Sequence, residues 1–87
     1  MSTMLEDFRH MDVRDANTTN GAILLYGTPN WWECISPIFS MRRIGRKVKD
    51  YSRRWAYVPQ NEKKDVIAAL RMGSKVGIAM IKIIQWL

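Results

Sequence analysis

The chain has 87 residues, of which 47% are hydrophobic and 25% are charged, and its formal net charge at pH 7 is +6. This composition excludes an intrinsically disordered protein, and the length leaves room for one small domain. Cys34 is the single cysteine, so a disulfide framework is excluded and we expect an intracellular, reducing compartment. The N-terminal residues lack a basic start followed by an apolar run, so we expect no secretory signal.

Charge is unevenly distributed along the chain. Residues 1–40 carry five acidic and two basic side chains, a balance of −3, whereas residues 41–64 carry nine basic and two acidic ones, a balance of +7. A strong local excess of one sign indicates a partner of the opposite sign. We therefore divide the chain into an acidic and apolar segment, residues 1–40, and a segment, residues 41–87, that holds a basic helix and an apolar C-terminal helix within one domain overall.

The acidic segment begins with a pattern that is typical of a helix start. Thr3 is followed three residues later by Glu6, which is the spacing of a capping box, and this predicts a short helix over residues 4–11. Residues 14–21 are rich in turn formers, so we predict a loop there that ends in a tight turn at Asn20-Gly21.

Two apolar runs follow this loop, and a turn rich in Gly, Pro and Asn separates them. This arrangement favours a β-hairpin over residues 22–35. A short buried helix over residues 22–26 is the alternative, because periodicity does not distinguish the two in so short a run. Trp31 and Trp32 would point to opposite faces of the second strand, so one of them is a candidate contact for a partner protein or a membrane.

A long basic helix is predicted over residues 37–58. Ser36 and Pro37 form a typical helix start, and Pro59 ends the helix. Apolar residues recur at alternating intervals of three and four, which aligns them along one side of a helix. This apolar stripe consists of Met41, Ile44, Val48, Tyr51, Trp55 and Val58.

Most other positions of the basic helix are cationic, and these are the candidate binding residues: Arg42, Arg43, Arg46, Lys47, Lys49, Arg53 and Arg54. Five of the seven are arginine, which suits bidentate contact with phosphate. Such a dense cationic surface favours a polyanion, either a nucleic-acid backbone or a layer of anionic lipid headgroups. Tyr51 and Trp55 either pack with the apolar stripe on another helix or stack on unpaired bases, and we include Trp55 among the candidates.

The last helix is predicted to begin after an Asn61 cap, and over residues 66–87 it is apolar around most of its circumference. A short chain has few elements to cover such a helix, so we expect its apolar sides to contact another subunit, a partner protein or lipid. Three cations within the run disfavour a transmembrane helix and leave an in-plane interfacial helix as the membrane hypothesis. Small residues spaced by four, Ala69, Gly73 and Gly77, would let a second helix approach closely. The candidate interface or membrane residues are Gly73, Gly77, Ile81, Ile84, Trp86, Trp31 and Trp32.

We therefore predict a mainly α-helical domain in which the two longer helices pack as a helical hairpin. The predicted function is non-enzymatic: a small basic protein, oligomeric or part of a larger assembly, binds RNA or DNA phosphates without reading the sequence. The alternatives are a peripheral membrane protein that uses the C-terminal helix and a structural subunit of a protein assembly. His10 and Cys34 lack the partners that catalysis or metal binding needs, so we predict no cofactor, no metal site and no small-molecule substrate.

The size and charge of the chain suit a virus-encoded or accessory role by analogy alone. The sequence does not distinguish RNA, DNA and lipid as the anionic partner.

Overall fold

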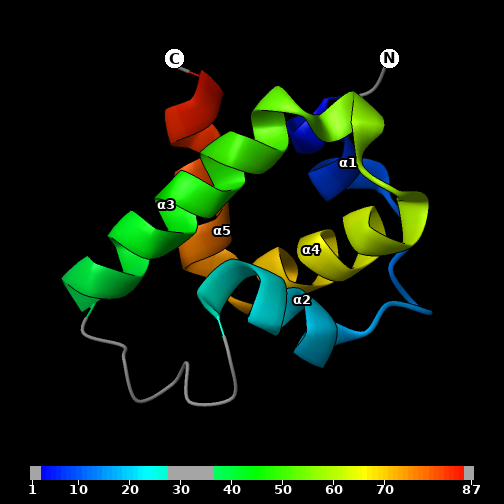
Figure 1. Cartoon of the computed structure of the whole chain (residues 1–87), viewed down its shortest axis with the longest axis horizontal. Coiled ribbons are helices and arrows are strands. Elements are labelled where there is room, and N and C mark those ends of the chain that lie inside the picture. Colours follow the sequence, from blue (N-terminus) through cyan, green and yellow to red (C-terminus); the bar gives the residue numbers. More distant parts are fainter. Residues whose placement is uncertain (1–2, 28–36, 86–87) are drawn as a thin grey trace.

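In the computed structural model, which describes residues 3–27 and 37–85, the chain is helical (Figure 1). Its elements are α1 (Met4–His10), α2 (Thr18–Tyr26), α3 (Pro37–Arg53), the short 3-10 helix η2 (Trp55–Tyr57), α4 (Gln60–Met72) and α5 (Ser74–Gln85). The described part of the chain contains no β-strand, and the predicted mainly α-helical class is confirmed. The radius of gyration is 11.9 Å, close to the ~12 Å expected for a compact chain of this length.

Helix α4 lies at the centre of the molecule. It packs against α2, α5 and α1, and Figure 1 shows it between α1 and α2. All six residues from Asp65 to Leu70 are buried, although they cover the whole circumference of the helix. The sequence predicted that this apolar surface would need a partner, but the other helices of the same chain cover it in α4.

Helices α2 and α4 approach each other closely in the core at Gly21. A Cβ atom on Gly21 would lie 1.9 Å from the backbone carbonyl oxygen of Asp65, so only glycine fits there. The Asp65 carboxylate accepts hydrogen bonds from the backbone N–H of Asn17 at 2.7 Å and from Nδ2 of Asn20 at 2.8 Å. This buried carboxylate therefore has partners, as a charge in a protein core requires. It lies at the N-terminal end of α2, where the helix dipole stabilises a negative charge.

Helix α1 matches its prediction closely. Oγ1 of Thr3 accepts a hydrogen bond from the backbone N–H of Glu6 at 3.2 Å, which is the predicted cap. At the other end, Arg71 of α4 donates hydrogen bonds to the backbone carbonyls of Phe8 and Met11. A charged guanidinium on these carbonyls satisfies acceptors that the end of a helix leaves open, and it fixes α1 on α4.

The predicted strand at the start of residues 22–35 is wrong, and the alternative, a short buried helix over residues 22–26, is confirmed. The predicted turn at Asn20-Gly21 is also wrong. Oδ1 of Asn17 accepts a hydrogen bond from the backbone N–H of Asn20 at 2.9 Å, so a helix begins at Thr18 and continues through the apolar run to Tyr26. Ala22 and Leu25, with Gly21 before them, form the buried side of this helix. The second predicted strand lies outside the described residues.

The prediction that the last helix is continuous is also wrong, because α4 ends at Met72 and α5 begins at Ser74. Gly73 turns the chain between them, with φ −89° and ψ 50°. A Cβ atom on Gly77 would lie 2.4 Å from the backbone oxygen of Leu70. The small residues were expected to let a second helix approach closely, and two of them do so within the chain: Gly77 lies against Leu70 of α4, and Ala69 lies against Gly21 of α2. The region predicted to hold two long helices packed as a hairpin therefore holds three helices, α3, α4 and α5.

Candidate nucleic-acid interface

The apolar stripe of the basic helix is buried as predicted. The described members of the stripe are all in the core: Ile44, Val48, Tyr51, Trp55 and Val58. The α-helix ends earlier than predicted, at Arg53, and Trp55 and Val58 reach the core through η2 and the residue after it. Because the stripe faces inward, the opposite side of α3 faces solvent.

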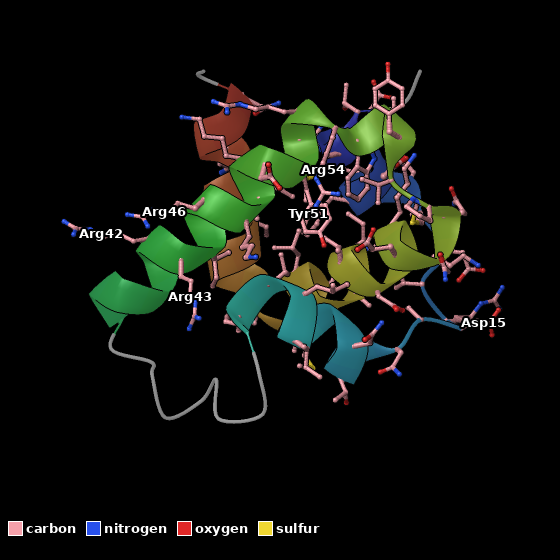
Figure 2. All side chains as sticks on the ribbon, in the orientation of Figure 1. Asp15, Arg42, Arg43, Arg46, Tyr51 and Arg54 are labelled. Atoms are coloured by element: carbon pink, nitrogen blue, oxygen red, sulfur yellow. The ribbon has the colours of Figure 1, made fainter. Side chains whose placement is uncertain are left out.

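Four cations form a single row on that outer side of α3: Arg42, Arg46, Lys49 and Arg53. Their spacing of four, three and four residues places them within about 60° of one another around the helix and over a rise of about 16 Å. All four are exposed, and Figure 2 shows Arg42 and Arg46 pointing away from the other helices. We call these four residues the cationic row.

The remaining candidate cations are Arg43 and Lys47, which lie on one flank of the row in α3, and Arg54, which directly follows α3. Nε of Arg54 lies 3.2 Å from Oδ2 of Asp50, and its guanidinium lies 4.6 Å from the centre of the Tyr51 ring. Arg43 lies beside the end of α2, since a Cβ atom on Gly27 would be 3.1 Å from Nη2 of Arg43. Among residues 3–27 and 37–85, by contrast, no carboxylate lies within ion-pair distance of any member of the cationic row.

Asp12 and Asp15 of the N-terminal segment lie in the loop between α1 and α2. Figure 2 shows Asp15 on the side of the molecule opposite Arg42 and Arg46. Near it, the Arg14 guanidinium pairs with Asp12 at 2.8 Å and holds the pKa of that exposed carboxyl below its usual value. The exposed charges of the cationic row therefore attract an approaching polyanion towards α3.

Two aromatic residues of the basic helix belong to the core, which corrects the inclusion of Trp55 among the binding candidates. Trp55 is 3% exposed, and its Nε1 donates a hydrogen bond to Oδ2 of Asp7 at 2.6 Å. The Tyr51 hydroxyl donates to Oε1 of Glu62 at 3.2 Å. Burial, followed by the neighbouring Glu62 carboxylate, raises the pKa of Tyr51. Neither ring is open to a base.

Sequence reasoning missed Tyr57, which is 89% exposed on η2. The available signal was its spacing: the apolar stripe includes residues 51, 55 and 58 and skips 57. A large aromatic that does not match the inward periodicity of its segment points away from the core. The candidate site therefore consists of the cationic row with Tyr57 beyond its C-terminal end.

The candidate interface or membrane residues differ in how the structure places them. Ile81 is 3% exposed and Gly77 is buried, so both pack within the chain, and Gly73 is partly buried at the helix junction. Trp31, Trp32, Trp86 and the side chain of Ile84 lie outside the described part of the structure. No helix in the described residues is both long enough and apolar enough to cross a membrane.

An apolar groove lies between α1 and α5, with two adjoining hollows of about 250 and 180 Å³. Leu5, Ile81 and Gln85 line both hollows, and the cations Arg9 and Lys82 lie at the second.

Within the described ranges, no group of three His, Cys, Asp or Glu side chains is placed to hold a metal ion.

The fold and the site define a small helical protein whose longest described helix presents a row of basic side chains to solvent. No known family model, curated protein or solved structure matches this chain.

Proposed function

We propose that the protein binds the phosphate backbone of nucleic acid through the cationic row, without base-specific readout and without catalysing a reaction. The observation that carries this proposal is the row itself: four exposed cations on one side of a helix whose opposite side is fixed in the core. Like charges this close repel one another, and a string of phosphates relieves that repulsion.

The arrangement suits backbone contact rather than base recognition. Three of the four side chains in the row are arginine, whose planar guanidinium binds phosphate oxygens in a bidentate manner. Contacts to phosphates position a protein on nucleic acid and carry no sequence information. Four such contacts predict that log K falls with log salt at a slope of about −3 to −4, which is roughly a 100-fold loss of affinity between 50 and 200 mM salt.

The test is a fluorescence anisotropy titration at these two salt concentrations, with a labelled 20-nucleotide single strand and its duplex. The variant Arg42→Gln/Arg46→Gln/Arg53→Gln removes three charges from the row. The control Arg9→Gln/Arg14→Gln/Lys82→Gln removes three exposed charges from α1, the following loop and α5. We expect the row variant to flatten the salt slope by two to three units and the control to leave it nearly unchanged. Equal losses in both variants would mean that only the net charge matters.

A second candidate function is contact with an anionic membrane or with another copy of the chain. It is supported by the exposed apolar side chains near the junction of α4 and α5, Met72 and Ile78, and by the exposed cation Lys82. Recovery of the protein with anionic liposomes at high salt would favour the membrane. A concentration-dependent increase in mass during sedimentation, lost in Ile78→Asp, would favour self-association.

A further inference from the structure

The exposed ring of Tyr57 is held by a short and well-fixed turn. Trp55 and Val58, on either side of it in the sequence, are 3% and 6% exposed and belong to the core. The backbone N–H of Tyr57 donates to the carbonyl of Arg54 at 2.9 Å, and that of Val58 donates to the carbonyl of Trp55 at 3.1 Å. The backbone under the ring is therefore fixed on both sides, while 89% of the residue is open to solvent.

Tyr57 also follows the cationic row closely in the chain. Figure 1 shows η2 continuing from the C-terminal end of α3. Arg53, the last member of the row, precedes Tyr57 by four residues, so chain connectivity keeps the two Cα atoms within about 14 Å of each other. One nucleic-acid strand that follows the row can therefore reach both the cations and the ring.

We infer that Tyr57 makes single-stranded nucleic acid the preferred ligand, because its ring stacks on an unpaired base at the end of the cationic row. The inference rests on the proposed function. A base within a duplex is already stacked on both faces, so it offers no face to an outside ring, whereas an unpaired base does. The ring recognises the π-face that every base has, so the preference is for strandedness and not for sequence.

The expected effect is large enough to measure. Removal of one stacking ring weakens binding to a single strand by about 5- to 150-fold. Duplex affinity should change less than twofold, and the salt slope should stay as in the wild type because no phosphate contact is lost. Tyr57→Phe retains the ring and should bind as the wild type does.

The experiment compares Tyr57→Ala, Tyr57→Phe and the control Met72→Ala, which shortens another exposed apolar side chain on a different helix. Each variant is titrated with a 20-nucleotide thymidine strand and with a 20-base-pair duplex at 50 and 200 mM salt. Circular dichroism confirms folding, which these surface changes should not disturb. Selective loss of single-strand binding in Tyr57→Ala, with binding retained in the other two variants, supports the inference.

Failure of this inference is distinguishable from failure of the proposed function. If Tyr57→Ala weakens single strand and duplex equally, or neither, while the salt slope of the wild type stays near −3 to −4, the stacking role is overturned and the phosphate contacts stand. If the wild type shows no salt-dependent binding to either ligand, the proposed function itself is overturned.

Discussion

Helices α3 and α4 differ in how much of their surface the rest of the chain covers. Helix α4 is buried on all sides over residues 65–70, since α1, α2 and α5 surround it. Helix α3 packs against α2 and α5 on one side only, and the cationic row faces solvent on the other. The position of a helix in the fold therefore determines what its surface can do: α4 contributes to the core around its whole circumference, whereas α3 has a free side for binding.

This difference also explains why apolar residues are distributed differently in the two helix sequences. A helix enclosed by its own chain needs apolar residues around its whole circumference, while a peripheral helix needs them only in a stripe. A helix that is apolar on all sides in a short chain therefore has two explanations: other helices of the same chain enclose it, or a partner molecule covers it. Only the arrangement of the other helices separates them.

The largest expected effect comes from α4. Leu70→Ala removes a fully buried side chain and should lower the free energy of unfolding by about 2–5 kcal/mol, since the surrounding helices cannot fully close the cavity. Met72→Ala, two residues later, removes a side chain that is 63% exposed and should change it by less than about 1 kcal/mol. Urea denaturation of both variants measures the difference. Similar losses in the two would contradict the central position of α4.

An intermediate effect is expected at the inward side of α3. Trp55→Phe keeps a ring in the core but removes the hydrogen bond from Nε1 to Asp7, and it should cost about 1–2 kcal/mol of stability. Nucleic-acid affinity should not change, because Trp55 does not face solvent. The reverse is expected for Arg42→Gln, which should weaken binding and leave the unfolding curve in place. If Trp55→Phe weakens binding in the folded protein, the separation of the two sides of α3 fails.

The smallest effect is a dependence of stability on alkaline pH. Because burial raises the pKa of Tyr51 above its ordinary value of 10.0, the folded state holds the hydroxyl proton more tightly than the unfolded state does. This contribution to stability is fully present below about pH 10 and is lost as pH rises through the folded-state pKa. Tyr51→Phe should therefore flatten the fall of unfolding free energy above pH 10. An unchanged slope would show that Tyr51 does not contribute to it.

The parts of the fold that depend on local periodicity could be predicted from the sequence. The apolar stripe was predicted correctly because helical spacing alone determines which residues share a side. The cap at Thr3 depends on two residues three positions apart. The exposure of the cations follows from the same pattern, since they occupy the positions that the stripe leaves.

The parts that depend on distant residues could not be predicted in the same way. The run over residues 22–26 is apolar enough for a strand, and its helical form depends on the Asn17 cap and on the contact of Gly21 with Asp65. The break at Gly73 is absent from the pattern because glycine also occurs within helices. Trp55 was ambiguous for a related reason: only the position of Asp7 shows that its ring and Nε1 both have partners in the core.

The hydrogen bonds of Asp65 imply an order of events during folding. Helix α2 has nine residues, too few for stability in isolation, and its first turn is completed by a carboxylate that lies 48 residues beyond Asn17 in the chain. We therefore expect the start of α2 to form only when α4 docks and closes a long loop. In native-state hydrogen exchange, the backbone amides of Asn17 and Asn20 should then open together with α4 rather than fray independently.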